Sequence, residues 1–270
     1  MDISVPYWLL TLLALLPFYS TANATPTKVV VYADDAYPPY SYAVVGEPKG
    51  VYTEILKLIF SKMKSYDVTI KPIPWKRGLK LLQLGKGFAL YPPYYYSDKR
   101  LYISPYSDPI LPEEVVVYCN PETADKRTLE NWPEDFYGLT IGINEAFALG
   151  GDEFWAAVDQ QKIFTLSAKG NKASLVNLYE RQTDCYINDR LSILWDIKNL
   201  KMDGTFPNDW MVTLSTVVSR EHGHLGFTNQ YPEQYPYKDD FVTQFNQQLK
   251  QLQQDGTIDQ VLSRYFQPYR

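Results

Sequence analysis

The sequence has very little of the side-chain chemistry on which metal centres and covalent catalysis depend. Among its 270 residues there are two cysteines and two histidines, and a net charge of −5 comes with no cluster of lysines or arginines. A mildly acidic chain of this kind is poorly suited to bind nucleic acid or an anionic membrane surface. We therefore expect neither of these partners.

The histidines, His222 and His224, lie in Glu-His-Gly-His-Leu-Gly, with no cysteine or third histidine near them in the sequence. We predict a surface turn there and no metal site. The sequence shows no glycine-rich phosphate loop and no nucleophile–base pair, so we also predict no cofactor. In an oxidising compartment Cys119 and Cys185 could form one disulfide, and two buried free thiols are equally consistent with the sequence.

The first 24 residues differ from the rest of the chain. Residues 8–16 form an apolar run, and Thr21-Ala22-Asn23-Ala24 has the small-x-small pattern of a secretory cleavage site. The run is too short for a bilayer span, which takes about 20 residues. We predict a signal peptide over residues 1–24, with an uncleaved anchor as the alternative, and therefore a periplasmic protein.

Two β-like runs end in polar or acidic residues. The run 29–32 is followed by Asp34, and the run 183–187 is followed by Asn188 and Asp189. Open α/β sheets bind their ligands at the carboxyl ends of strands. Two sheets that each place a carboxylate at a strand end indicate a two-lobed protein that closes on a small molecule.

Strand and helix patterns alternate in two separate series along the chain, which predicts an α/β fold with largely parallel sheets. The predicted strands are 29–32, 68–70, 88–91, 113–118, 139–143, 184–187 and 213–219. Helical spacing of apolar residues follows most of them. We predict that residues 25–114 and 216–270 form lobe 1, that residues 115–215 form lobe 2, and that the chain crosses between the lobes twice.

Several short motifs in a fixed order suggest a family. They are Tyr37-Pro38-Pro39-Tyr40 after the first strand, Gly50-Val51-Tyr52-Thr53-Glu54-Ile55 at the first helix, Ser97-Asp98-Lys99-Arg100 before Ser104-Pro105-Tyr106, and Asp255-Gly256-Thr257-Ile258 leading to Tyr265-Phe266. Each motif alone is weak. Together, over nearly the whole mature chain, they resemble an extracytoplasmic solute-binding protein of family 3, the polar amino-acid-binding class of ABC importers. The resemblance implies a two-lobed periplasmic-binding-protein-like fold of type II, with two sheets joined by a two-strand hinge.

The resemblance also implies a set of ligand contacts. Arg100 falls where the family holds the ligand's α-carboxylate, a role that suits a guanidinium because it donates bidentate, charge-assisted hydrogen bonds. Asp189 falls where the family receives the α-ammonium, although a helix N-cap alone would also explain it. Tyr37 and Trp75 fall at the aromatic walls around the ligand side chain, with core packing as the alternative for Trp75. Further candidates are Asp34, Asn144 and Asn188.

Two stretches depart from the family pattern. The segment 91–96, Tyr-Pro-Pro-Tyr-Tyr-Tyr, replaces the small residues that usually precede the arginine, and proline has no N–H to donate. We include Tyr95 from this segment among the ligand-binding candidates. The loop 144–148 replaces a Gly-Thr-rich turn, and Arg77 adds a second group that could bind an anion. These departures put a standard amino-acid ligand in doubt.

The resemblance implies a non-catalytic binding protein, expected to be monomeric, that closes on a small polar solute and docks on an ABC transporter permease. The expected solute is an amino acid or a related zwitterion or carboxylate. One alternative is an enzyme on the same fold, such as a prephenate or arogenate dehydratase-like protein, which needs a general acid in the cleft. Asp34, Glu145 and Asp189 are the candidates for that acid. The other alternative is a soluble partner that senses a ligand for a receptor.

Overall fold

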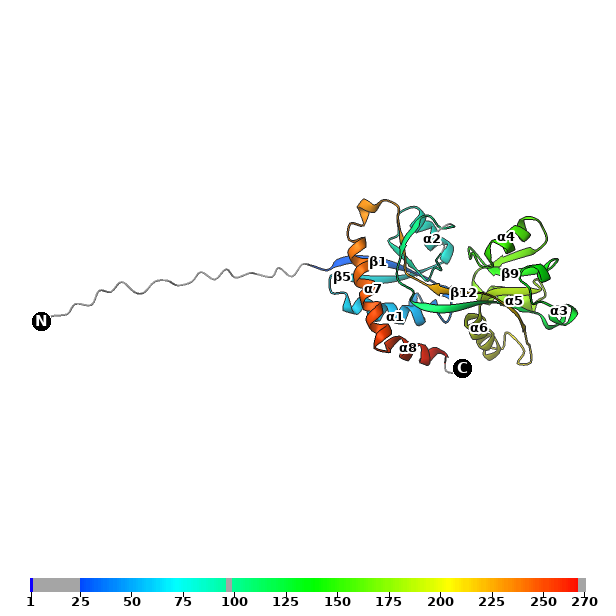
Figure 1. The fold of residues 1–270 in the computed structure, drawn as a ribbon. Helices are drawn as coiled ribbons and strands as arrows, with labels where there is room; N and C mark the ends of the chain where they lie inside the picture. Colours follow the sequence, from blue (N-terminus) through cyan, green and yellow to red (C-terminus); the bar gives the residue numbers. More distant parts are fainter. Residues whose placement is uncertain (2–24, 96–98, 267–270) are drawn as a thin grey trace.

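The computed structural model describes Met1 and residues 25–95 and 99–266. Residues 2–24 of the predicted signal peptide, and Ser97 and Asp98 of the arginine motif, lie outside the described residues. The described chain forms two α/β lobes that lie side by side (Figure 1). The predicted two-lobed α/β fold is confirmed.

Lobe one is built on a five-stranded sheet. In spatial order its strands are β5 (Tyr66–Ile73), β1 (Thr27–Asp34), β6 (Ala89–Tyr91), β13 (Gly226–Thr228) and β7 (Ile103–Tyr106). Strand β1 is parallel to both β5 and β6, whereas β13 is antiparallel to its two neighbours. The helical elements of this lobe are α1 (Val51–Lys62), α2 (Trp75–Gln83), α7 (Lys238–Gln254), α8 (Thr257–Phe266) and the short turn η2 (Pro232–Gln234).

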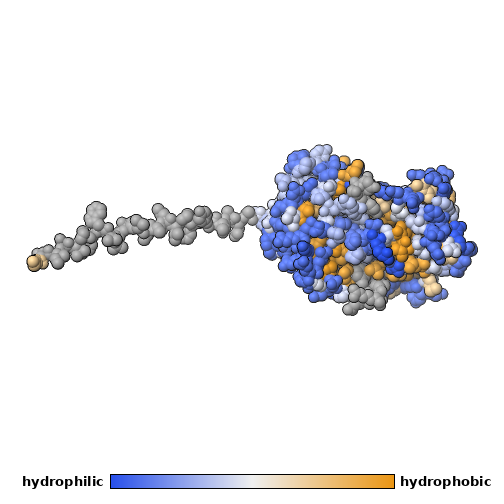
Figure 2. Space-filling view, viewed as in Figure 1, coloured by the Kyte–Doolittle hydropathy of each residue, from blue (hydrophilic) through white to orange (hydrophobic). Residues whose placement is uncertain are grey.

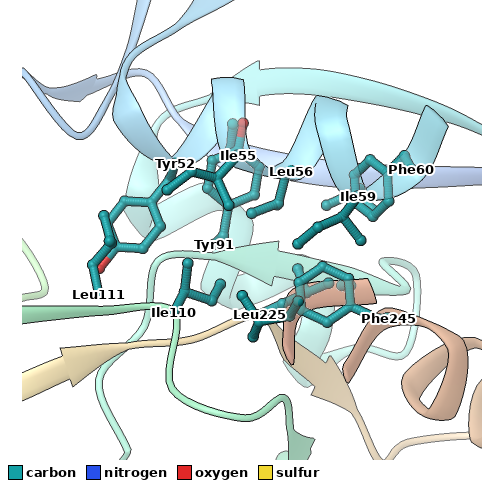
Figure 3. Packing of buried hydrophobic residues seen from close by; sticks show 14 of the residues in the cluster. Tyr52, Ile55, Leu56, Ile59, Phe60, Tyr91, Ile110, Leu111, Leu225 and Phe245 are labelled. Atoms are coloured by element: carbon teal, nitrogen blue, oxygen red, sulfur yellow. The ribbon is translucent and has the colours of Figure 1, made fainter. Parts of the chain in front are cut away.

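The main core of lobe one lies between its sheet and helices α1, α7 and α8. Val29 and Val31 alternate along β1 and are both buried in this core. Figure 3 shows Leu56 and Ile59 of α1 above Phe245 of α7, which belongs to the same cluster. Burial of each such side chain contributes roughly 1.5–3 kcal/mol. Helix α2 packs separately, on β1, β6 and β13.

A three-stranded sheet that the sequence patterns did not predict extends lobe one. It consists of β2 (Ala36–Tyr37), β3 (Ser41–Val44) and β4 (Glu47–Lys49). Its packing against the start of α1 depends on Gly50. That residue has φ +110°, and a Cβ atom there would lie 2.4 Å from the carbonyl oxygen of Tyr40. This sheet places Tyr37 directly after β1.

Lobe two has its own five-stranded sheet. In spatial order its strands are β10 (Phe164–Ala168), β9 (Thr140–Asn144), β11 (Cys185–Asp189), β8 (Leu111–Cys119) and β12 (Thr213–Gly223). Its helical elements are α3 (Pro121–Lys126), η1 (Glu134–Phe136), α4 (Gly151–Asp159), α5 (Gly170–Tyr179) and α6 (Arg190–Met202). The valines of β8 alternate between two cores. Val115 and Val117 belong to the cluster with α4, and Val116 belongs to the cluster with α5 and α6.

Strands β8 and β12 connect the lobes. They pair antiparallel from Cys119 with Thr213 to Leu111 with Gly223, and Figure 1 shows β12 at the junction. The predicted lobe boundaries, at 114/115 and 215/216, fall inside these two strands. Residues 115–119 of β8 lie in the lobe-two sheet, between β12 and β11. Towards Leu111 the strand pairs with β12 alone, and Leu111 packs in the lobe-one core.

Cys119 and Cys185 form a disulfide. They lie opposite each other in the antiparallel register of β8 and β11, which answers the question that the sequence left open. The bond lies at the end of the sheet remote from Asp189, the last residue of β11.

The surface in the view of Figure 2 is mainly hydrophilic, with smaller groups of hydrophobic residues. Within the described part of the chain, no helix combines the length and hydropathy that a membrane span requires.

Candidate functional site

A small cavity lies between the lobes. Its lining residues are Asp34, Tyr37, Trp75, Pro92, Tyr94 and Arg100 from lobe one, and Phe147, Ala148 and Leu149 from lobe two. Its volume is about 30 Å³, whereas pockets for drug-sized ligands span about 300–1,000 Å³. A second cavity of about 30 Å³ shares Asp34, Trp75 and Phe147 with the first and extends to Asn144. Side chains of the protein itself therefore fill most of the cleft.

Trp75 and Arg100 meet on the lobe-one side of this cleft. Trp75 is the first residue of α2, and Pro74 precedes it as the N-cap, one position earlier than the proline is expected in a helix. The Arg100 guanidinium lies over the indole ring, 5.5 Å from its centroid. Such a contact is stronger when it is desolvated, and both side chains are buried.

Phe147 enters the cleft from lobe two and is a site residue that the sequence predictions missed. Its ring packs edge-on against Tyr37, with centroids 5.7 Å apart, and against Trp75, with centroids 6.2 Å apart. It also packs against buried residues of both lobes. The two predicted aromatic walls are thus brought to one cleft, and a side chain of this chain contacts both of them.

The backbone beside Phe147 is held by Arg100. One guanidinium nitrogen of Arg100 donates to the carbonyl oxygen of Ala146 at 3.3 Å. Ala146 has φ +62°, a left-handed conformation that costs a non-glycine residue roughly 1–2 kcal/mol. The loop 144–148, whose sequence departs from the family pattern, therefore crosses the cleft and contacts lobe one.

Further contacts bridge the lobes around the same loop. Lys76 of α2 forms an ion pair with Glu145 at 2.8 Å, and Lys99 forms one with Asp152 at 2.5 Å. Both pairs are substantially exposed, so each contributes little to stability, about 0–1 kcal/mol. The hydroxyl of Ser192 donates to the carbonyl oxygen of Pro38 at 2.7 Å, which fixes α6 against lobe one.

Asp34 is the carboxylate that lines both cavities. It ends β1, and one of its oxygens accepts a hydrogen bond from the backbone N–H of Ala36 at 2.9 Å. Burial, with a smaller contribution from the neighbouring Asp35, raises the pKa of Asp34 to about 7, although the hydrogen bond from Ala36 lowers it. A positively charged group in the cleft would favour the ionised form of Asp34.

A buried cluster of one carboxylate and three tyrosines lies beneath the cleft. Glu113 of β8 accepts hydrogen bonds from the hydroxyls of Tyr37, Tyr52 and Tyr94, the last at 2.7 Å. All three tyrosines come from lobe one. Burial, together with the nearby carboxylate of Asp189, raises the pKa of Glu113 to about 8. The sequence predictions missed Glu113. Its position two residues before Val115 puts it on the same buried face of β8, and this alternation could have identified it.

Asp189 lies beside Glu113 rather than on the cavities. It caps α6 by accepting from the backbone N–H of Ser192 at 2.8 Å, and it accepts from the N–H of Glu114 at 3.1 Å. Burial raises its pKa to about 6. The helix-cap alternative is therefore present in the structure, whereas a ligand contact by Asp189 stays a prediction.

Asn144 and Asn188 belong to one buried polar network in lobe two. The side-chain amides of both residues donate to the side-chain oxygen of Asn171, at 2.7 Å and 2.8 Å. The Tyr186 hydroxyl donates to the side-chain oxygen of Asn144 at 2.8 Å. Asn144 also lines the second cavity, and Asn188 lines neither. The network holds the carboxyl ends of β9 and β11 beside α5, while the side-chain oxygen of Asn188 is buried without a hydrogen-bond partner among the described residues.

Two predicted contacts lie outside the cavities. Arg77 is exposed on α2, and Tyr95 is 59% exposed, with its ring 4.9 Å from that of Tyr106. Neither lines the two interlobe cavities, so their ligand roles stay predictions. The expected surface turn at the two histidines was wrong. His222 is exposed but lies in strand β12, and His224 is buried and hydrogen-bonded through Nδ1 to the carbonyl oxygen of Ser107 at 2.8 Å.

The arrangement suits binding through charge and aromatic contact. Arg100 and Asp34 supply one group of each sign, and Tyr37 and Trp75 supply two aromatic surfaces. Among the described residues, no group of three or more His, Cys, Asp or Glu side chains is arranged to hold a metal ion.

Solved structures with the same fold cover nearly the whole chain. A structure from work on glutathione import in Gram-positive bacteria, through GshT and the cystine ABC importer TcyBC of Streptococcus mutans, has a TM-score of 0.73 and 16% identity, over 89% of this chain and 95% of that one. A histidine kinase sensor domain similar to periplasmic binding proteins has a TM-score of 0.71 and 14% identity, over 89% and 96%.

An ancestral amino acid-binding protein, a precursor of cyclohexadienyl dehydratase, has a TM-score of 0.66 and 19% identity, over 88% of this chain and 95% of that one. At such identities the similarity shows the fold alone. No curated protein sequence matches the chain. The family model that matches, over residues 29–268, is that of the bacterial extracellular solute-binding proteins, family 3.

Proposed function

We propose that this chain, which belongs to the bacterial extracellular solute-binding proteins of family 3, is a non-catalytic receptor that closes on a small solute and delivers it to an ABC importer. The observation that carries the proposal is the interlobe cavity, which Arg100 and Asp34 of lobe one line together with Phe147 of lobe two. A solute that contacts both lobes favours the closed form.

The residues on the cavity support an amino-acid-like solute. Arg100 binds its carboxylate, and Asp34 accepts its cationic group. Tyr37 and Trp75 contact its side chain. This assignment gives Asp34 the role that the sequence resemblance implied for Asp189, because Asp34 lines the cavity and Asp189 does not. The protein acts as a monomer in the periplasm, reached through the signal peptide at residues 1–24.

A calorimetric screen tests this function. The mature wild-type protein is titrated with amino acids, dicarboxylates, amines and short peptides, and the best solute is then titrated into Arg100→Gln. Loss of a desolvated charge pair costs about 2–5 kcal/mol, so we expect the variant to bind at least ~30-fold more weakly. Lys162→Gln is the matched control, since Lys162 lies over Tyr137 in lobe two, away from the cleft. Equal binding by Arg100→Gln and wild type would refute the site.

An enzyme on the same fold is a second candidate, because Asp34 combines a cavity position with a pKa of about 7. A raised pKa of this kind suits a general acid. The discriminating observation is the fate of the solute. Quantitative recovery of the unchanged solute after long incubation with the protein supports the receptor, whereas conversion that Asp34→Asn abolishes supports the enzyme.

A ligand sensor is a third candidate, because a histidine kinase sensor domain shares the fold. A sensor and an importer receptor bind their solutes in the same way, so binding data do not separate them. Pull-down of membrane partners with the solute-loaded protein does, since the importer role requires a transporter permease and the sensor role requires a signalling receptor.

A further inference from the structure

The loop 144–148 occupies the cleft in the manner of a ligand. It presents a carbonyl oxygen, that of Ala146, to the guanidinium of Arg100 at 3.3 Å. The next residue, Phe147, places a phenyl ring against Tyr37 and Trp75. One dipeptide of lobe two therefore contacts both features of lobe one to which the proposed function assigns the solute.

The contact of Ala146 with Arg100 and the contact of Phe147 with Tyr37 and Trp75 are two different kinds of interaction. The first joins a cationic hydrogen-bond donor to an oxygen acceptor, and the second joins three aromatic rings in edge-on geometry, which is a favoured arrangement of aromatic pairs. The cavity beside them measures only about 30 Å³, far below the roughly 300–1,000 Å³ of pockets that hold drug-sized ligands. A solute and the Ala146–Phe147 pair therefore compete for the same space.

We propose that Ala146–Phe147 is an internal ligand mimic, which a solute must displace, and that the solute is an acid carrying a ring of about phenyl size. The inference rests on the proposed function, because it assumes that Arg100, Tyr37 and Trp75 bind the solute. A carboxylate replaces the Ala146 carbonyl on Arg100 and makes a stronger, charge-assisted contact there. The aromatic ring of the solute replaces Phe147 between the same neighbours.

The loop has the features that displacement requires. Ala146 has φ +62°, so the contact is made at a cost in backbone energy that release of the loop recovers. The Lys76–Glu145 ion pair that accompanies it is exposed and adds little. Because the solute must displace the loop, its apparent affinity is the intrinsic affinity of the open cleft multiplied by the fraction of molecules in which the cleft is open.

The test compares wild type, Phe147→Ala and a matched control by isothermal titration calorimetry. The control is Phe164→Ala, which removes a phenyl ring from the exposed part of β10 in the same lobe. The probes are L-phenylalanine, 3-phenylpropionate and L-alanine. Phenylalanine and phenylpropionate share the ring, and the two amino acids share the zwitterionic head.

Removal of the mimic makes the cleft available, so Phe147→Ala binds both ring-bearing probes at least ~10-fold more tightly than wild type does. L-Alanine must displace the same dipeptide from Arg100, so it gains by a similar factor. It binds Phe147→Ala more weakly than L-phenylalanine does, because it has no ring to take the place of Phe147. The Phe164→Ala control matches wild type with all three probes. Circular dichroism melting confirms that each variant is folded.

Other outcomes overturn the inference. Weaker binding of the ring probes by Phe147→Ala would mean that Phe147 contacts the solute. Unchanged binding would mean that Phe147 has no effect on it. A failure of both proteins to bind either ring probe removes the assigned solute class. If the screen of the proposed function still finds a solute that depends on Arg100, that function stands and only the mimic is refuted. If no solute depends on Arg100, the proposed function fails first.

Discussion

The hydroxyl of Tyr37, whose ring lines the cleft, donates a hydrogen bond to the carboxylate of Glu113 in the hinge strand β8. Tyr94 lines the same cavity and donates to the same carboxylate. Two tyrosines that line the cavity are thereby hydrogen-bonded to a strand that joins the lobes. Changes at Glu113 are therefore expected to act on both stability and the geometry of the cleft.

The stability of the protein should decrease as pH rises. Burial raises the pKa of Asp34 to about 7, of Asp189 to about 6 and of Glu113 to about 8. A carboxyl whose pKa is raised on folding keeps a proton that the unfolded chain releases near pH 4, so the free energy of unfolding falls between about pH 4 and pH 8. Calorimetric melting temperatures should be higher at pH 5 than at pH 8.

Glu113→Gln should flatten this pH dependence. The substitution keeps the shape of the side chain but removes one titrating group, whose share is on the order of a few kcal/mol across that range. Asp135, which is partly exposed, provides the control Asp135→Asn, because hydrogen bonds from the backbone and side chain of Asn131 lower its pKa. This variant should retain the decrease of stability with rising pH. An unchanged slope in Glu113→Gln would mean that Glu113 does not titrate in this window.

Asp189→Ala should be strongly destabilising. Asp189 caps α6 and accepts from Glu114, and Arg100 lies over Trp75. Loss of an N-cap costs about 1 kcal/mol, and an unpaired buried N–H adds about 1–3 kcal/mol. Urea denaturation of Asp189→Ala should show this loss, and Asp189→Asn, which keeps one acceptor oxygen, should recover part of it.

The disulfide should stabilise lobe two without affecting the site. It links residues 66 positions apart in the sequence, and a disulfide that closes a loop of this size contributes about 2–4 kcal/mol. The double variant Cys119→Ala/Cys185→Ala should melt at a lower temperature than wild type and bind solute with the same affinity. A loss of affinity would mean that the remote end of the sheet is coupled to the cleft.

Much of this structure follows from local patterns. The apolar run of β1 and the acidic residues after it place Asp34 at a strand end, because both depend on residues close in sequence. Trp75 was named from the resemblance to the family, and helical spacing predicts only the helix that it begins. The three-stranded sheet of β2, β3 and β4 was missed, since two- to four-residue strands carry too little periodicity to detect.

The parts that sequence patterns did not predict depend on contacts between distant segments. Phe147 becomes a site residue only when loop 144–148 crosses to Tyr37 and Trp75 of the other lobe. The disulfide required the register of β8 against β11, which places Cys119 opposite Cys185. Periodicity gives the face on which a residue lies, but it does not give its partner on another strand or lobe.

Gly170 offers a test of lobe closure itself. It opens α5 in lobe two with φ +73°, and a Cβ atom there would lie 2.9 Å from the carbonyl oxygen of Ala36 in lobe one. Gly170→Ala should therefore hold the lobes apart and weaken solute binding by ~10-fold or more, as expected when the binding-competent form becomes a minor population. Isothermal titration calorimetry measures the affinity, and small-angle scattering reports the separation of the lobes.

The matched control is Gly204→Ala. Gly204 has a similar φ of +78°, and a Cβ atom there would meet nothing within 4 Å. Both substitutions place alanine in a left-handed conformation at a cost of roughly 1–2 kcal/mol, so both should lower the melting temperature to a similar extent. Only Gly170→Ala should lose affinity, because only its methyl group meets the opposite lobe. Equal affinities in the two variants would show that α5 and β2 need not approach each other for the protein to bind its solute.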